Sequence, residues 1–209
     1  MTVQIDLSPS FSPIRDQGQR PTCLAFAASS AHELALGRTE PLSVEALFFH
    51  CKRRDGLSAA RGTTVAATAD VLGTLGQCAE VLWPYGESEP ALFPSDYFRA
   101  RIEERARLGL LDLVKQALKA ARAPVLVVYL TNAWFSVKPD GLITPPAPND
   151  QREGAHAVTV IGYDDATATV LIRNSWGKDW GSGGYAQLPF SQVESNGIEV
   201  FTLGAASTP

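Results

Sequence analysis

Cysteine is scarce in this chain: there are three cysteines among 209 residues. An odd and small number excludes a disulfide framework of the kind that stabilises small secreted domains. The first residues also lack the basic start and apolar core of a secretory signal. Together these absences predict free thiols and residence in the cytoplasm. A processed precursor, or export without a recognisable signal peptide, would leave the same pattern and stays open.

An excess of basic charge is absent as well. The 18 lysines and arginines face 22 acidic residues, for a net charge of -4, which gives no electrostatic basis for binding nucleic acid. No run approaches the ~20 apolar residues of a membrane span. The cysteines and histidines lack metal-ligand spacing, and no nucleotide-binding glycine loop is present. We therefore expect no cofactor, no metal, no nucleic acid and no membrane partner.

The first half of the chain carries helical patterns. A run of small and apolar residues extends from Cys23 to Leu36 and stops at Gly37, as a buried helix would. Ser43 is a candidate N-cap for a second helix, and Thr63 or Thr64 for a third that ends near Leu75. Apolar spacing predicts two further helices, over residues 95–108 and 111–122.

The second half changes to the pattern of β-strands. Short β-rich runs cover residues 125–130, 157–163, 169–173, 184–188 and 198–203, which predicts an antiparallel sheet or a small barrel. Residues 138–154 hold four prolines and read as a long exposed loop. We expect one domain over residues 1–209. Its helical lobe would cover about residues 10–110, and a β-rich lobe would combine residues 111–209 with the N-terminal segment.

Cys23 is the strongest candidate for chemistry. It opens the first predicted helix, where unpaired backbone N–H groups favour a thiolate. Gln17 lies six residues earlier and can bring an amide N–H near the sulfur. A nucleophile beside a donor for a developing oxyanion is the arrangement that acyl transfer needs.

A cysteine nucleophile needs a base, and three histidines are available. His32 lies too far along the helix that Cys23 opens, and His50 lies near a helix end among charged residues, so both read as structural or surface residues. His156 follows the proline-rich loop and immediately precedes a predicted strand. A strand can hold its imidazole rigidly over a cleft, which makes His156 the candidate base.

Asn174 supplies a partner for that imidazole. It ends a predicted strand and opens a segment with two tryptophans and two glycines, from Trp176 to Gly181. An asparagine oxygen can fix the histidine tautomer without adding a negative charge, and Trp176 could shield that hydrogen bond from water. The alternative is a tryptophan-rich corner that only packs.

These three motifs together resemble the papain-like, cathepsin-like cysteine peptidases (family C1), over nearly the whole chain. The resemblance rests on Gln17-Gly18 through Cys23, on His156-Ala157-Val158 followed by Gly162-Tyr163, and on Asn174-Ser175-Trp176-Gly177 with Trp180-Gly181. It implies an α+β fold with two lobes. The helical lobe would contain the central nucleophile helix, and the other lobe an antiparallel, barrel-like sheet.

The resemblance also implies roles. Cys23 would be the nucleophile, His156 the base and then the acid, and Asn174 the orienting residue. Gln17 and the Cys23 backbone N–H would form the oxyanion hole. The family's substrate-binding paired glycines align with Arg61-Gly62, and Arg61 would narrow that wall or favour an acidic or polar substrate residue. Ala155 and Trp176 complete the expected substrate-binding set.

Several positions depart from the family pattern. A disulfide cysteine usually lies three residues before the nucleophile, where this chain has Arg20. Leu24 replaces the tryptophan that usually follows the nucleophile, and Pro21 stiffens the loop. Cys51 and Cys78 do not occupy positions that would pair, so we expect buried free thiols.

The resemblance favours an endopeptidase that hydrolyses peptide or protein substrates through a thioester. Two alternatives stay open: another amide acyl transfer on the same triad (transpeptidase, transamidase or amidase), and a binding module without catalysis. The chain begins about twenty residues before Cys23, which leaves no room for an inhibitory pro-segment. We therefore expect restraint by narrow specificity, by a regulatory protein partner, or by a domain of a longer protein.

Overall fold

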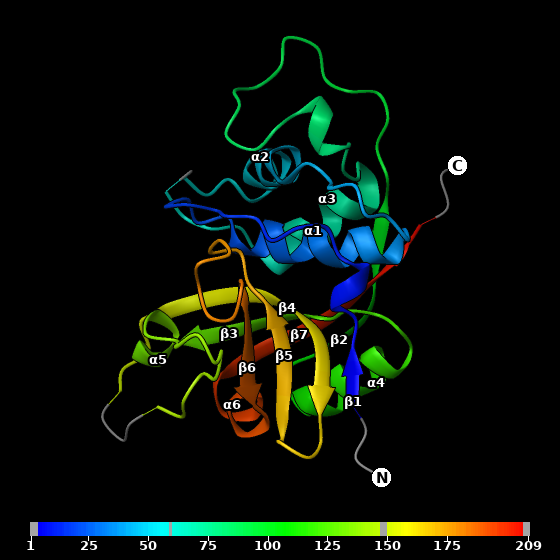
Figure 1. Ribbon diagram of the computed structural model, residues 1–209. Helices are drawn as coiled ribbons and strands as arrows, with labels where there is room; N and C mark the ends of the chain where they lie inside the picture. Colours follow the sequence, from blue (N-terminus) through cyan, green and yellow to red (C-terminus); the bar gives the residue numbers. More distant parts are fainter. Residues whose placement is uncertain (1–3, 59, 147–149, 207–209) are drawn as a thin grey trace.

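The first three helices form one region of the molecule, and the sheet with the later helices forms another. The computed structural model describes residues 4–58, 60–146 and 150–206. Helices α1 (Cys23–Ala35), α2 (Val44–Asp55) and α3 (Val65–Thr74) lie together above a curved sheet, and α1 rests directly on the strands (Figure 1). The α+β, two-lobe arrangement expected from the sequence is therefore present.

The helix ends follow from local chemistry. Ser43 Oγ accepts a hydrogen bond from the Ala46 N–H at 3.0 Å, and Thr64 Oγ1 accepts one from the Ala67 N–H at 3.1 Å. Both side chains satisfy N–H groups that the first turn of a helix leaves unpaired. Gly56 ends α2 in the left-handed conformation, with φ of 65°, which a glycine adopts at little cost.

Among the described residues, seven strands form the sheet, and all their pairings are antiparallel. The order is β2-β7-β3-β4-β5-β6, with β1 beside the end of β4. The strands are β1 (Gln4–Asp6), β2 (Ala100–Ala106), β3 (Val125–Leu130), β4 (Gly154–Asp164), β5 (Thr169–Arg173), β6 (Tyr185–Pro189) and β7 (Gly197–Ala205). The five strands predicted in the second half are confirmed, although β4 begins earlier than expected and therefore includes His156.

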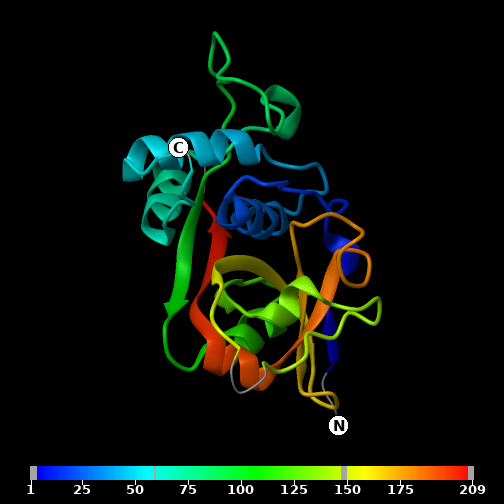
Figure 2. The ribbon, with the colours of Figure 1, turned by 90° about the vertical axis from the view of Figure 1, so that its left-hand side faces the viewer.

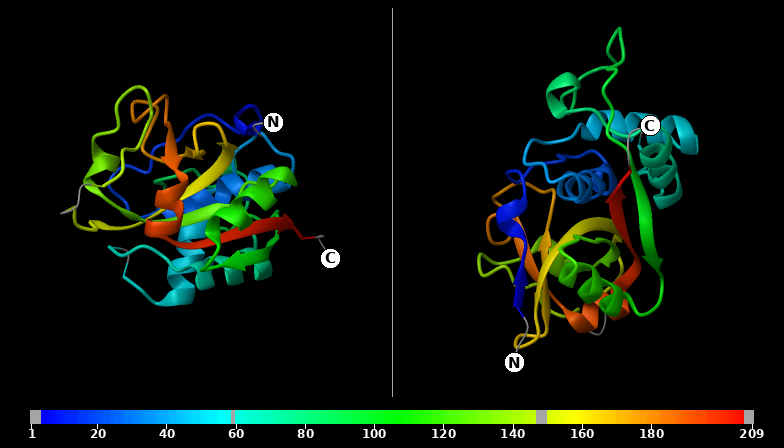
Figure 3. Two further views of the ribbon diagram at one scale, coloured as in Figure 1. Left: turned by 90° about the horizontal axis from the view of Figure 1, so that it is seen from below. Right: turned by 90° about the vertical axis from the view of Figure 1, so that its right-hand side faces the viewer.

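The helix predicted over residues 95–108 is wrong. Residues Ala100–Ala106 form β2, in which exposed and less exposed side chains alternate. β2 pairs with β7, and the two strands run side by side from the sheet to the helical region (Figures 2 and 3). Alanine, arginine and glutamate favour helix in isolation. Pairing with a distant strand overrides that preference, because a strand's stability depends on its neighbours.

The proline-rich loop is not exposed throughout. Ile143 is fully buried, and its N–H donates to the Gln187 carbonyl at 3.0 Å. Residues 147–149 of the predicted loop lie outside the described residues. Strand β6 therefore holds one part of this connection against the sheet.

Two apolar cores stabilise the lobes. One lies between the helices α1, α2 and α3 and the near face of the sheet, and it includes Phe26, Leu47 and Phe201. The other lies between the far face and the helices α4 (Leu110–Lys119), α5 (Asn132–Phe135) and α6 (Phe190–Asn196). The sequence predicted α4 but not α5 or α6, which have four and seven residues.

The structure also describes the cysteines, the possible metal ligands and the length of the helices. Cys51 and Cys78 are free and fully buried, as predicted. Within residues 4–58, 60–146 and 150–206, no group of three or more histidine, cysteine or acidic side chains is arranged to hold a metal ion. No helix in that part of the chain is both long and apolar enough to cross a bilayer.

Candidate active site

A cleft of about 530 Å³ opens where the start of α1 meets the sheet. Cys23 reaches it from the helical lobe, and Ala155 and His156 reach it from β4. The residues aligned with the family's paired glycines, Arg61 and Gly62, line the same cleft. The fold thus brings together residues from three distant segments of the chain.

Cys23 is the first residue of α1, and the side chain of the N-cap residue Thr22 does not cap that helix. The Thr22 hydroxyl lies 2.8 Å from the Tyr85 hydroxyl and makes no capping hydrogen bond. Burial raises the pKa of the Cys23 thiol, while hydrogen bonding from the backbone of Ala157, Leu24 and Cys23 itself lowers it. The net direction is upward, so the thiolate expected from the helix terminus alone is opposed by desolvation. The hydrogen bond from Ala157 also places the sulfur beside the backbone that carries His156.

His156 is held by Asn174. The imidazole Nε2 lies 2.7 Å from Asn174 Oδ1, which also accepts the Ser175 N–H at 2.9 Å. An oxygen that accepts fixes the ring as the tautomer with hydrogen on Nε2, so Nδ1 is left as the proton acceptor. Burial lowers the pKa of His156 to about 4, although the hydrogen bond to Asn174 raises it. The resting ring is therefore neutral at pH 7.

Aromatic rings cover the imidazole. The Trp176 ring centroid lies 4.7 Å from that of His156, and Trp134 meets His156 edge-on at 6.0 Å. Phe135 stacks on the outer face of Trp176 at 5.6 Å. The sequence predicted the shielding by Trp176 but missed Trp134 and Phe135, which α5 supplies. The sequence pattern that could have indicated them is a pair of large aromatic residues shortly after a predicted strand.

Gln17 is fixed close to these residues. Its Oε1 accepts the Ser175 hydroxyl at 2.7 Å, and its Nε2 donates to the Arg20 carbonyl at 2.7 Å. An amide nitrogen carries two hydrogens, so one N–H remains for another acceptor. Gln17 is not among the described residues that line the cleft, and the sequence did not indicate Ser175 as its partner.

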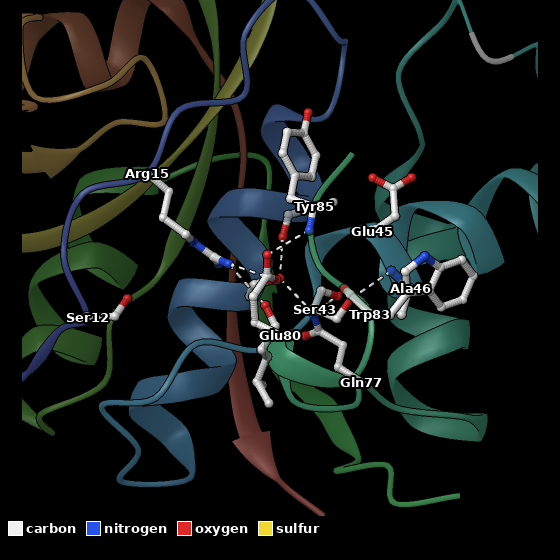
Figure 4. Close-up of polar contacts among 12 residues, drawn as sticks. Ser12, Arg15, Ser43, Glu45, Ala46, Gln77, Glu80, Trp83 and Tyr85 are labelled. Carbon is white, nitrogen blue, oxygen red and sulfur yellow. Dashed lines mark hydrogen bonds and ion pairs between the residues drawn. The ribbon is translucent and has the colours of Figure 1, made fainter. Parts of the chain in front are cut away.

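A polar network connects Arg15, Glu80 and Tyr85 (Figure 4). Arg15 contacts Glu33 at 3.2 Å and Glu80 at 3.3 Å. Glu80 also accepts the Tyr85 N–H at 2.8 Å, and the Tyr85 hydroxyl donates to the Gln17 carbonyl at 2.9 Å. Buried charges need such partners. The network therefore connects the Gln17 loop to the segment after α3.

Arg20 occupies the position where the family usually has a disulfide cysteine, and it makes an ion pair there. Its guanidinium contacts both carboxylate oxygens of Glu45, at 2.5 and 2.7 Å, and lies 4.8 Å from the Tyr85 ring centroid. Glu45 also accepts the Gly86 N–H at 2.9 Å. A bidentate pair with a cation–π contact thus holds the loop before Cys23 against the first turn of α2.

The wall formed by Arg61 and Gly62 is supported from behind. Lys52 Nζ donates to the Arg61 carbonyl at 3.2 Å and to the Gly62 carbonyl at 3.0 Å. A Cβ added at Gly62 would lie 3.3 Å from the Pro21 carbonyl oxygen, so a side chain would crowd the loop that carries Cys23. A residue without a side chain keeps this wall close to the nucleophile loop.

The other two histidines lie away from the cleft. His32 is fully buried, with Nδ1 3.0 Å from Gln77 Oε1. His50 belongs to an aromatic cluster that includes Phe49, Trp83 and Phe93. Neither lines the cleft that contains Cys23.

Comparisons with known proteins agree with this geometry. The family model for "Papain family cysteine protease" matches residues 3–204. Mouse (Mus musculus) cathepsin J is 31% identical over 189 residues, which cover 85% of this chain and 56% of that protein. The thiol protease aleurain of Arabidopsis thaliana is 27% identical, over 85% of this chain and 52% of its own length. The chain therefore spans between half and two thirds of these relatives.

Solved structures show the same likeness. Xylellain, a cysteine protease from Xylella fastidiosa, superposes with a TM-score of 0.81 at 25% identity, over 98% of this chain and 86% of that one. The cysteine protease CMS1MS2 of Carica candamarcensis, solved in complex with E-64, has a TM-score of 0.71 at 21% identity over 99% of both chains. With a family model that matches almost its whole length, this chain belongs to the papain family of cysteine proteases.

Proposed function

We propose that the chain is a cysteine endopeptidase that cleaves peptide or protein substrates through a Cys23-His156-Asn174 triad and a thioester intermediate. The observation that carries the proposal is the 2.7 Å contact between His156 Nε2 and Asn174 Oδ1, on a histidine that shares a cleft with Cys23. That contact leaves the other ring nitrogen to accept a proton from the thiol.

Burial favours the neutral thiol and the neutral imidazole in the free cleft. In the proposed first step, His156 takes the thiol proton while Cys23 Sγ bonds to the substrate carbonyl carbon. The carbonyl oxygen becomes an oxyanion, and the Cys23 N–H and the remaining Gln17 N–H are its proposed donors. The C–N bond then breaks as the imidazolium protonates the leaving amine, which leaves a thioester.

Water completes the cycle. His156 accepts a proton from the attacking water, the C–S bond breaks, and the thiol regains its proton. Asn174 keeps the imidazole in the tautomer that accepts a proton first from the thiol and then from water. Trp176 excludes water from the hydrogen bond between His156 and Asn174. Arg61, Gly62 and Ala155 are the proposed contacts for the substrate chain.

The proposal is tested by labelling and by product analysis. E-64, an epoxide directed at thiols, should add one label per chain, at Cys23. The label should be lost in His156→Ala and retained in the control Cys78→Ala, because Cys78 is fully buried. Mass spectrometry of a peptide library should then give cleavage products with the unmodified chain and none with Cys23→Ala.

Other outcomes would favour the alternatives. Products joined to an added amine would indicate acyl transfer in place of hydrolysis. Absence of both labelling and cleavage would contradict the triad and favour a binding module that has the fold without the chemistry.

A further inference from the structure

Three paired residues on neighbouring strands form a row across the sheet, and this row lines the cleft. Val127 on β3 lies opposite Ala157 on β4 and opposite Glu199 on β7. Paired residues share a face of the sheet, and adjacent strands lie ~4.8 Å apart, so Glu199 is about 10 Å from the residue that follows His156. All three residues line the cleft. Glu199 therefore stands within about three residues of the proposed cleavage point along an extended substrate.

Strand β2 and the residue that follows it add two guanidinium groups beside Glu199. Arg105 lies opposite Phe201, on the same face as Glu199, and Arg107 follows two residues later. Both line the cleft. Arg105 Nε contacts one oxygen of Glu199, and Arg107 Nε lies 3.3 Å from the other. The two strands lie side by side in Figures 2 and 3.

One carboxylate cannot neutralise two guanidiniums. The Glu199 side chain is 5% exposed, whereas Arg105 is 40% and Arg107 is 72% exposed. The negative charge is therefore buried and fully engaged, while positive charge faces solvent. A lysine or arginine of a substrate would have to displace one of the two arginines to reach Glu199.

The part of the cleft wall that contains Arg61 is also positively charged. Arg61 is exposed, and no ion pair involves it within the described part of the chain. The charged groups among the described lining residues, His156 aside, are Arg61, Arg105, Arg107 and Glu199. The cleft thus has two positive charges in excess, although the whole chain has a net charge of -4. The walls of a cleft concentrate the electric field of these charges on a ligand that enters it.

We infer that this cleft selects substrates with a glutamate or aspartate within three residues of the cleaved bond, held by Arg107 and Arg105. The inference deepens the proposed function and rests on it, because the bound peptide is a substrate only if the chain cleaves it. A substrate carboxylate that enters between the two arginines neutralises the positive charge that Glu199 alone does not. It accepts charge-assisted hydrogen bonds from the planar guanidinium groups.

The test separates binding from cleavage. An array of acetylated hexapeptides, in which each position in turn is glutamate, glutamine or lysine, is probed with the Cys23→Ala variant, which binds without turnover. At one position, glutamate should bind about three- to tenfold more tightly than glutamine, with lysine weakest. The preference should shrink as salt is raised, because the arginines are solvent-exposed.

Two variants should move this preference in opposite directions, each made in the Cys23→Ala background. Arg107→Gln keeps the contact between Arg105 and Glu199 and should bring glutamate down to the level of glutamine. Glu199→Gln frees both guanidiniums and should widen the preference for glutamate. Arg101→Gln is the control, because Arg101 is exposed on the same strand and does not line the cleft.

Several results would overturn the inference: a preference for lysine that Glu199→Gln abolishes, equal binding of all three residues, no binding of any hexapeptide, or no effect of Arg107→Gln. Tight binding of acidic peptides without their cleavage by the unmodified chain would instead support the inference and contradict the proposed function alone.

Discussion

The Nε2 atom of His156 lies 2.7 Å from the Oδ1 atom of Asn174, and the two residues are 18 positions apart in the chain. β4 and β5 are adjacent and antiparallel, and Asn174 follows the last residue of β5. His156 and Asn174 are each only 4% exposed, and the Trp176 ring packs against the imidazole. A hydrogen bond in such surroundings orients the ring more firmly than it would in water.

Replacement of Asn174 by alanine should therefore lower the rate of peptide cleavage. Without its acceptor the ring can adopt the other tautomer, and the loss of one buried hydrogen bond corresponds to a decrease in kcat of about 10- to 100-fold. Steady-state kinetics on one peptide measures it, with Gln116→Ala as the control because Gln116 is exposed on α4. An unchanged kcat in Asn174→Ala would remove Asn174 from the proposed mechanism.

The buried His156 should make stability depend on pH. Its pKa falls from 6.5 to about 4 in the folded chain, so the unfolded chain binds the proton more tightly. The destabilisation is absent above about pH 6.5, grows as the pH falls, and is complete below about pH 4. Because His32 and His50 also have lowered pKa values, His156 must be isolated by a variant.

Urea unfolding of the unmodified chain and of His156→Gln provides that comparison. Between pH 7 and pH 4.5, the free energy of unfolding should fall by about 2 to 3 kcal/mol less in the variant than in the unmodified chain. Parallel losses in the two proteins would show that the ring is readily protonated in the folded state.

The ion pair of Arg20 with Glu45 should contribute measurably to stability. The Arg20 side chain is 39% exposed, so solvent screens part of the attraction. The bidentate geometry and the Tyr85 ring offset that screening, and we expect Arg20→Gln to cost about 1 to 2 kcal/mol in urea unfolding.

Arg53→Gln is the matched control for Arg20→Gln. The Arg53 side chain is 69% exposed, and its guanidinium lies 3.9 Å from Glu89, so the cost should be under about 0.5 kcal/mol. The double variant of Arg20 and Glu45 should lose less than the sum of the two single changes. Strict additivity would mean that the two side chains do not stabilise the fold through their contact.

Gly76 should tolerate no side chain. It has φ of +93°, and an added Cβ would lie 2.1 Å from the Phe98 carbonyl oxygen. Gly76→Ala must therefore separate the bridge between Gln77 and Phe98, and we expect a loss of more than about 3 kcal/mol. Thermal unfolding measures it.

Gly56→Ala separates backbone strain from the clash. Gly56 has φ of +65°, and apart from its chain neighbours no atom of the described residues lies within 4 Å of the added Cβ. Only the left-handed conformation is therefore penalised, by about 1 kcal/mol. Equal losses in Gly56→Ala and Gly76→Ala would contradict the clash.

Features that depend on residues close in the chain are predictable from the sequence. Ser43 and Thr64 cap their helices because an N-cap acts within three residues, and the β-rich runs of the second half predicted five strands. The order of Gln17, Cys23, His156 and Asn174 indicated the family. The predicted roles of these four residues are still to be tested by experiment.

Features that depend on partners far apart in the chain are visible in the folded molecule alone. Residues 100–106 favour helix locally and form a strand because β7 lies beside them. No local pattern indicates that Arg20 pairs with Glu45 or that two arginines contact Glu199. The same holds for the contacts of Trp134 with His156 and of Phe135 with Trp176. Desolvation likewise opposes the thiolate that the helix terminus favours, because burial is a property of the packed molecule and not of the helix alone.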